Sequence, residues 1–337
     1  MTGLALVARL LPVAAAAALV ASCAMPGHSP SSDPRTLHFD RAQVGRGAGL
    51  AAIGNCVTCH TAPLGKPFAG GYALKTPFGT VYGSNITPDP ETGIGRWSEA
   101  DFTRALRDGV SPEGHNYYPA FPYDYFTRLS DADISALYAF VMTREPVPSI
   151  PPANTMIVPR FAVTAWKRWY FDRKPFRPEP ARDARWNRGA YLAQALAHCS
   201  ACHTPRNALG AEKRGLYMSG GEADDWHAPA LNARSPSPVP WNEESLASYL
   251  RTGLVDSHAI TAGPMQDVVA NLSHAPAEDV RSLASYIASL QSRAKSDLDR
   301  QSQAALSAVA KPVPREGIGR GAELYAGACG DCHDRGR

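Results

Sequence analysis

Apolar residues recur along the chain at the three- and four-residue spacing of amphipathic helices. Two such stripes are clear, one opened by Leu129-Ser130-Asp131 and the other by Leu272-Ser273. Their apolar positions are Ile134, Leu137, Tyr138 and Val141 in the first, and Val280, Leu283, Ala284 and Ile287 in the second. The pattern predicts two helices that each bury one face, in two separate segments of the chain.

A shorter predicted helix precedes each stripe. Ser98 and Asn242 each follow a tryptophan and precede acidic residues, which is typical of a helix start, and a later glycine is typical of its end. The corresponding positions are Trp97, Leu106 and Gly109 in the first segment and Trp241, Leu250 and Gly253 in the second. Identical offsets indicate an internal repeat. We interpret both tryptophans as core aromatics.

The repeat extends upstream, where Arg-Gly-Ala precedes a Cys-x-x-Cys-His motif. It begins at Arg46, Arg188 and Arg320, and the glycine stands eight to ten positions before the first cysteine, enough for a short helix. The three motifs run from Cys56 to His60, from Cys199 to His203 and from Cys329 to His333.

Each motif predicts a covalent haem c site. Two thiols three positions apart on one turn can add to the vinyl groups of a porphyrin, and the next histidine can ligate the iron. The predicted attachment residues are Cys56, Cys59, Cys199, Cys202, Cys329 and Cys332, and the predicted proximal ligands are His60, His203 and His333. A thioredoxin-like redox pair and half a zinc site are the alternatives. Three copies argue against both, because a redox motif needs one pair and zinc needs four converging ligands.

The composition excludes some classes of function but indicates no particular chemistry. The chain has 337 residues, of which 44% are hydrophobic and 19% charged, and its formal charge of +3 is too small to indicate a nucleic-acid partner. We expect an all-α fold of tandem c-type cytochrome domains with long irregular loops. The expected boundaries are a lipoprotein-type signal at 1–23, a flexible tether at 24–40, cytochrome c domain 1 at 41–145, a linker at 146–183, cytochrome c domain 2 at 184–291, a linker at 292–314, and the start of a truncated third domain at 315–337.

The seventh cysteine, Cys23, follows an apolar run from Leu10 to Val20 and the small residues Ala21 and Ser22. This arrangement resembles a bacterial lipoprotein signal, which implies a diacylglycerol on Cys23. Ordinary cleavage nearby and an uncleaved anchor are the alternatives. Because bacteria attach haem c outside the cytoplasm, we expect a lipid-anchored protein on the periplasmic side of the membrane.

The second haem has a candidate second iron ligand. Met265 follows Gly263-Pro264 and lies 62 residues after His203, just before the last predicted helix. A methionine there would raise the reduction potential of the haem. Met218 is a weaker competitor.

The first segment lacks this methionine, because Phe121 stands 61 residues after His60 and cannot bind iron. We expect the sixth site of the first haem to be filled by His115, filled by Met142, or open. Met142 belongs to an apolar stripe, so core packing is its favoured role.

Pro63 and Pro205 follow their histidines closely. Each is a candidate for the backbone carbonyl that accepts the proximal Nδ1–H, although each can also be a simple turn residue.

The segment from Arg160 to Arg188 holds nine Lys and Arg and three Asp and Glu, interleaved with aromatic residues. Such a segment can rest on a lipid surface, dock a partner or serve as a strap between domains. The sequence leaves these three interpretations open.

Longer strings carry a family resemblance. They are Thr76 to Tyr82, Asn85 to Gly95, Tyr118 to Tyr123, Cys199 to Glu212 and Trp226 to Asn232. The chain resembles the three-haem cytochrome c subunits of bacterial membrane-bound dehydrogenases for alcohol, gluconate and aldehyde. Where the alcohol dehydrogenase branch has methionine, this chain has Phe121, and the strings look closest to the branch paired with molybdenum hydroxylases such as aldehyde or nicotinate dehydrogenase.

The resemblance implies an electron-transfer subunit with no catalytic residues of its own. Its partners would be dehydrogenase subunits with molybdopterin and iron–sulfur clusters, or a quinoprotein, with electrons passing to ubiquinone or a terminal oxidase. The alternative is an enzyme or sensor, namely a multihaem peroxidase or a haem gas sensor, using a first haem that lacks a methionine ligand.

Overall fold

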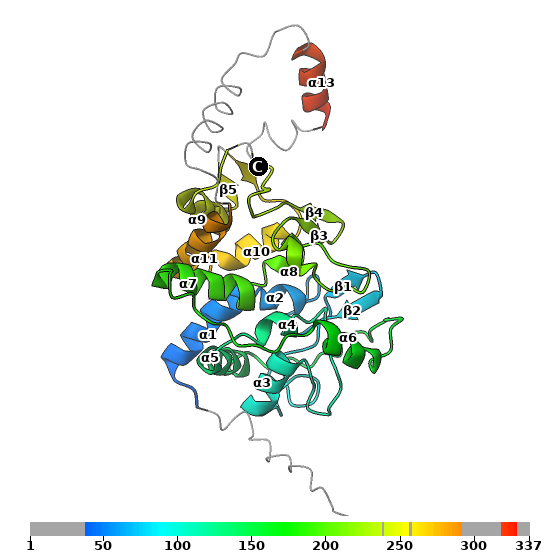
Figure 1. The fold of residues 1–337 in the computed structure, drawn as a ribbon. Helices are drawn as coiled ribbons and strands as arrows, with labels where there is room; N and C mark the ends of the chain where they lie inside the picture. The colour runs from blue at the N-terminus through cyan, green and yellow to red at the C-terminus, as the bar shows by residue number, and fades with distance from the viewer. Residues whose placement is uncertain (1–37, 238, 256–257, 292–317, 329–337) are drawn as a thin grey trace, which may run out of the picture. The chain divides into compact units, whose positions relative to one another are not determined.

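The computed structural model describes residues 38–237, 239–255, 258–291 and 318–328 (Figure 1). The predictions for Cys23, Cys329, Cys332 and His333, most of the tether and the whole of the second linker lie outside these residues. Within the described part of the chain, most regular structure is helical and the strands form short antiparallel hairpins. The predicted all-α class is therefore confirmed at the level of a helix-rich fold, while the domain boundaries stay predictions.

The elements follow one another in a repeated order. The helices are α1 (Arg41–Ile53), α2 (Cys56–Cys59), α3 (Glu99–Asp108), α4 (Tyr123–Phe126), α5 (Asp131–Met142), α6 (Ala162–Tyr170), α7 (Ala184–Tyr191), the π-helical η2 (Leu192–Leu196), α8 (Ser200–His203), the 3₁₀ turn η3 (Arg214–Leu216), α9 (Glu243–Thr252), α10 (Met265–Leu272), α11 (Ala277–Leu290) and α13 (Ile318–Ala328). The hairpins pair β1 (Ala73–Thr76) with β2 (Gly79–Tyr82), β3 (Gly221–Ala223) with β4 (Trp226–Ala228), and β5 (Leu254–Val255) with β6 (Ala259–Ile260). None of the described helices is long and apolar enough to span a bilayer.

The caps of α3 and α9 confirm the repeated helix predicted after each tryptophan. Ser98 and Asn242 each accept a hydrogen bond from the backbone N–H of the third helical residue, completing a capping box. Gly109 and Gly253 end the helices at φ +60° and +75°, a left-handed conformation that glycine adopts without strain. Trp97 lies partly buried against the hydrophobic core, which agrees with the packing role expected for it.

The last helix of the first segment starts where predicted, but that of the second does not. Ser130 caps α5, whereas Leu272 ends α10 and α11 begins only after Pro276. A proline disfavours the helical conformation of the residue before it, so the chain turns between the two helices. The predicted start at Leu272-Ser273 is therefore wrong, although the apolar stripe itself lies in α11.

The helix before each Cys-x-x-Cys-His motif crosses the last helix of its segment at a glycine. A methyl group on Gly47 of α1 would lie 2.0 Å from the carbonyl oxygen of Ala136 on α5. One on Gly189 of α7 would lie 1.8 Å from the carbonyl oxygen of Ser282 on α11. Only glycine lets the two backbones approach this closely.

An ion pair stands beside each crossing. Arg46 donates from Nε and Nη2 to Asp133 at 2.9 and 2.6 Å, and Arg188 donates to Asp279 at 2.8 and 2.9 Å. Asp133 is buried and also accepts a 2.6 Å hydrogen bond from the Tyr191 hydroxyl. This carboxylate therefore ties the first segment to the second.

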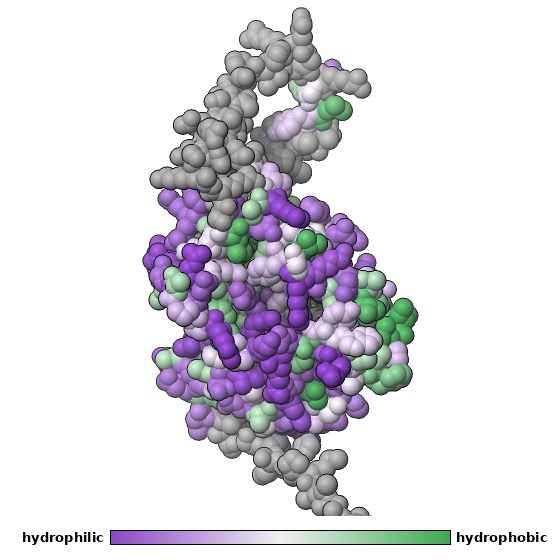
Figure 2. All heavy atoms as spheres, viewed as in Figure 1, coloured by the Kyte–Doolittle hydropathy of each residue, from purple (hydrophilic) through white to green (hydrophobic). Residues whose placement is uncertain are grey.

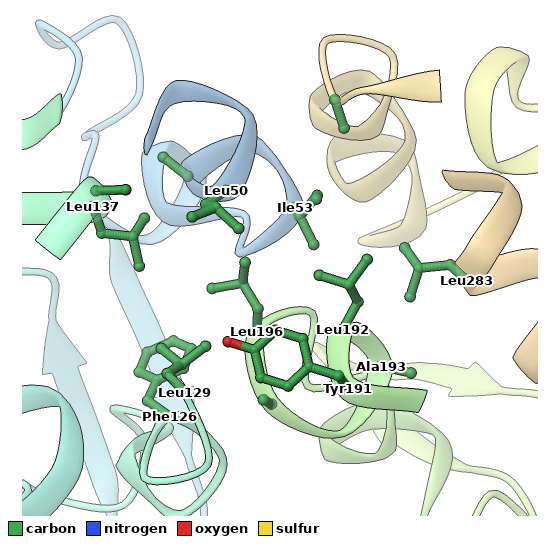
Figure 3. Packing of buried hydrophobic residues seen from close by; sticks show 14 of the residues in the cluster. Leu50, Ile53, Phe126, Leu129, Leu137, Tyr191, Leu192, Ala193, Leu196 and Leu283 are labelled. Carbon is green, nitrogen blue, oxygen red and sulfur yellow. The ribbon is translucent and has the colours of Figure 1, made fainter. Parts of the chain in front are cut away.

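One hydrophobic core continues through both segments. In Figure 3, Leu50 and Ile53 of α1 lie opposite Leu192 and Leu196 of η2. All four side chains are almost completely buried. The two motif-bearing segments are consequently packed on each other rather than joined only by a linker.

The spacing from the crossing glycine to the first cysteine differs by one residue between the two segments, and a π-helical turn accommodates the difference. Gly189 precedes Cys199 by one residue more than Gly47 precedes Cys56. The extra residue is accommodated in η2, which widens the helix locally. Both motifs can thus follow equivalent helix crossings despite unequal spacing.

We expect Gly47→Ala to lower the free energy of unfolding by about 1–3 kcal/mol, because the methyl group collides with backbone. Gly45→Ala is the matched control on the same helix, since nothing lies within 4 Å of a methyl group there. It should raise stability by about 0.5–1 kcal/mol through helix propensity. Denaturant unfolding of the holoprotein, followed by circular dichroism, measures the stability of both variants. Equal changes in the free energy of unfolding for Gly47→Ala and Gly45→Ala would contradict a close crossing at Gly47.

Candidate haem sites

The first two Cys-x-x-Cys-His motifs each form a single helical turn. Cys56 is the first residue of α2 and Cys59 is the last. Cys199 directly precedes α8, which contains Cys202. The residue before each first cysteine has a left-handed backbone, with φ 53° at Asn55 and 37° at its counterpart His198. This kink ends the incoming helix and starts the motif turn. Cysteines three apart on such a turn point to the same side, as the predicted attachment requires.

Both motif histidines are oriented by a backbone carbonyl. Nδ1 lies 2.7 Å from the Ser84 carbonyl oxygen in His60, and 2.7 Å from the Pro229 carbonyl oxygen in His203. A carbonyl only accepts, so Nδ1 carries the proton and Nε2 keeps the lone pair that a metal needs. Burial lowers the pKa of both imidazoles, which favours this neutral form.

The predicted carbonyl acceptors, Pro63 and Pro205, are wrong. The true acceptors lie 24 and 26 residues after their histidines, on loops that return to the motif. No local spacing rule reaches that far. Pro229 stands within one of the strings that carry the family resemblance, but nothing in that string distinguishes its carbonyl.

None of the four described motif cysteines is buried and Cys59 is exposed, yet the surrounding protein raises the pKa of each thiol. Desolvation raises the pKa of Cys56 and of Cys199 to about 12, and the pKa of Cys59 to about 11. A redox-active pair or a zinc thiolate has the opposite shift. The described cysteines form no disulfide, and no cluster of three or more His, Cys, Asp or Glu in the described residues could hold a metal ion. Neutral thiols on one turn, followed by a fixed imidazole, fit a covalently held haem.

The two methionine candidates of the second segment are placed differently. Met265 is the first residue of α10 and lies half-buried against the core. Met218 is fully buried, with φ 55°, and its backbone N–H donates to the Thr204 hydroxyl at 2.9 Å. Met265 starts a helix and keeps part of its side chain accessible, so it stays the preferred candidate.

The two candidate iron ligands of the first segment, Met142 and His115, lie in different surroundings. Met142 is buried on α5 within the hydrophobic cluster, which agrees with the packing role. His115 is exposed in a turn whose backbone is paired with Ser111. Phe121 packs against the rings of Tyr117 and Phe126, with centroids 5.5 and 5.7 Å apart. An aromatic cluster thus occupies the position that corresponds to Met265, and His115 stays a prediction.

Two side chains that sequence reasoning missed connect the first motif to the second segment. Asn271 on α10 donates from Nδ2 to the Thr58 hydroxyl at 3.0 Å and also to Asn55. Thr58 stands between the two cysteines of the first motif. Because α10 begins with Met265, one short helix links the candidate ligand of the second site to the attachment turn of the first.

The residue just before the second motif also contacts the first segment. The ring of this residue, His198, lies 6.0 and 5.9 Å from the rings of Tyr125 and Phe126 on α4 of the first segment. The two candidate sites therefore share one frame.

Comparison with known proteins places these features in context. No model of a known protein family matches the chain. The chain is 46% identical over 314 residues to a nicotinate dehydrogenase subunit of Pseudomonas putida, an alignment that covers 91% of this chain and 26% of that protein. It is 37% identical over 310 residues to the gluconate 2-dehydrogenase cytochrome c subunit of Pantoea cypripedii, covering 87% and 69%. It is 34% identical over 270 residues to a diheme cytochrome c-type protein of Cereibacter sphaeroides, covering 76% and 88%. The chain thus spans about a quarter of the nicotinate dehydrogenase protein.

We expect Met265→Leu to abolish methionine ligation at the second haem, while Met218→Leu preserves it. Leucine keeps the volume but has no sulfur, so each change costs less than about 1.5 kcal/mol in packing. The absorption band of methionine-ligated ferric haem and the spin state report the result. If Met218→Leu alone removed the band, the assignment would be reversed.

Replacing Cys199 and Cys202 together by alanine should lower the covalently bound haem by one per chain, because both thioether bonds of that site are lost. Pyridine haemochrome absorbance and the intact mass measure the loss. Cys23→Ser is the control, since it removes a cysteine outside the motifs and should leave the haem content unchanged. An unchanged content in the double variant would refute haem attachment at this motif.

Proposed function

The chain belongs to the family of cytochrome c subunits of bacterial dehydrogenases, and from this premise we propose that it relays single electrons from a partner dehydrogenase through three covalent haems to ubiquinone or a terminal oxidase. A haem held by this motif supplies a one-electron redox step. The protein supplies attachment, axial ligands and insulation, while substrate oxidation takes place on the partner.

The observation that carries the proposal is the shared frame of the first two candidate sites. Electron transfer is fast only between closely and rigidly mounted centres. Here Asp133 accepts from Tyr191 across the segments, and Asn271 donates to Thr58 inside the first motif. Both contacts hold the two attachment turns in a fixed relation, as a relay needs.

The histidine geometry supports the same function. Ser84 and Pro229 accept the Nδ1–H of His60 and His203, so the rings cannot rotate freely. A fixed ring keeps the iron ligand in place through oxidation and reduction, which limits the structural change that each electron transfer requires.

The third haem is proposed from sequence alone. Cys329, Cys332 and His333 repeat the motif after another Arg-Gly-Ala sequence. The proposed location, on the periplasmic side of the membrane with a diacylglycerol on Cys23, rests on the sequence preceding that cysteine and on the site of haem c attachment in bacteria.

The proposed partner is a molybdenum hydroxylase with molybdopterin and iron–sulfur clusters. The similarity to the nicotinate dehydrogenase protein supports this branch over a quinoprotein partner. The aromatic environment of Phe121, where the alcohol dehydrogenase branch resembled by this chain has methionine, points in the same direction.

We expect the oxidised holoprotein, mixed with a dehydrogenase that carries molybdopterin and iron–sulfur clusters and with that enzyme's substrate, to become reduced at a rate set by the dehydrogenase concentration. Stopped-flow absorbance of the haems measures this. The variant lacking Cys199 and Cys202 is the control, since it should accept fewer electrons per chain and pass them on to a quinone analogue more slowly. Peroxide turnover by the purified chain, without reduction by any dehydrogenase, would instead indicate a peroxidase.

A further inference from the structure

Helix α6 lies in the basic, aromatic linker. The side chains on its inner face are buried or hydrogen-bonded to residues outside the helix. Val163 is 3% exposed. Lys167 donates from Nζ to the carbonyl oxygens of Asp108 and Gly109 at 2.6 and 3.0 Å, and to Oδ1 of Asn116 at 2.6 Å. The lysine thereby satisfies carbonyls at the end of α3 and fastens α6 to the first segment.

Trp166 fastens α6 to the second segment as well. Its Nε1–H donates to the carbonyl oxygen of Leu209 at 3.0 Å. The inner face of α6 thus forms a strap between the segments, one of the three roles that the sequence left open. This fixes the orientation of the helix and of its opposite face.

The opposite face of α6 is apolar and exposed. Phe161 immediately precedes the first residue of α6 and is 79% exposed, and Trp169 is 69% exposed. Ala165 lies between them at a spacing of four, so the three residues share one side of the helix. Ile157, four residues before Phe161, is 78% exposed. Figure 2 shows hydrophobic residues gathered beside α6 on this side of the molecule. We name Phe161, Ala165, Arg168 and Trp169 the outer face of α6.

Positive charge accompanies this outer face. Arg168 is exposed and forms no ion pair with the residues that the structure describes. Arg160 is exposed beside Phe161, where it donates to the Asn116 carbonyl at 2.9 Å and covers the Tyr118 ring at 5.1 Å. Aromatic side chains among arginines are the composition that binds at an anionic lipid interface.

The size of the outer face favours lipid over protein. A helix of nine residues is about 14 Å long. One face of it falls well below the roughly 1,000 Å² that a specific protein interface buries. Insertion of two aromatic side chains among lipid headgroups requires no such area, because the bilayer adapts to the inserted groups.

We propose that the outer face of α6 docks on an anionic phospholipid surface, with Phe161 and Trp169 inserted among the headgroups and Arg168 paired with phosphate. This contact is separate from the electron relay and from the diacylglycerol proposed on Cys23. It would orient the body of the protein toward the membrane.

The test uses holoprotein in which an ordinary cleavable export signal replaces residues 1–23, so that neither an acyl chain nor an apolar leader contributes, in sedimentation with lipid vesicles. We expect binding to phosphatidylcholine vesicles that contain phosphatidylglycerol, weaker binding to pure phosphatidylcholine, and release by salt. Phe161→Ser with Trp169→Ser should weaken the binding about tenfold or more, since both apolar groups are lost. Arg168→Glu should weaken binding to the anionic vesicles alone.

Leu254→Ser with Ile260→Ser is the matched control, because these residues are 51% and 68% exposed on the β5–β6 hairpin. The control should bind vesicles like the unchanged chain, and an unchanged haem spectrum shows that each variant is folded. Equal loss in the control, or full binding by the Phe161 and Trp169 variant, would overturn the proposal. Loss of dehydrogenase binding with lipid binding intact would assign the outer face to a protein partner instead.

Discussion

Direct backbone contact between two helices is the constraint on which the rest of this structure depends. At Gly47 and again at Gly189, the helix that leads into a Cys-x-x-Cys-His motif touches the carbonyl of the last helix in its segment. No side chain fits in that contact. Because the motif follows within ten residues, the crossing determines where each attachment turn lies.

The two crossings are joined into one unit by polar contacts that the repeat does not duplicate. Arg46 and Arg188 each pair with an aspartate near the start of the last helix, but only Asp133 also accepts from Tyr191 of the other segment. Asn271 adds a second link to the first motif. The contacts that are repeated in both segments position each motif. The contacts of Tyr191 and Asn271, which occur only once, hold the two motifs together.

Rigidity of this kind serves electron transfer better than catalysis by the chain itself. Backbone carbonyls of Ser84 and Pro229 orient the imidazoles, and aromatic rings fill the position of the first segment that corresponds to Met265. These contacts hold the two motif histidines in one orientation. The strap helix α6 extends the same frame while leaving its outer face free for a surface.

The sequence by itself determined several features that depend on neighbours along the chain. It predicted the turns formed by the first two Cys-x-x-Cys-His motifs, the caps at Ser98 and Asn242 and the glycine that ends each capped helix, because those interactions span a few residues. Pro276 is an equally local signal, and it accounts for the break between α10 and α11 that the apolar stripe alone does not predict. The acceptors of the histidine protons and the contact of Asn271 with Thr58 were decided only by the tertiary structure. They join residues separated by 24 to 213 positions, and loop closure over such distances depends on how the whole core packs rather than on any local pattern.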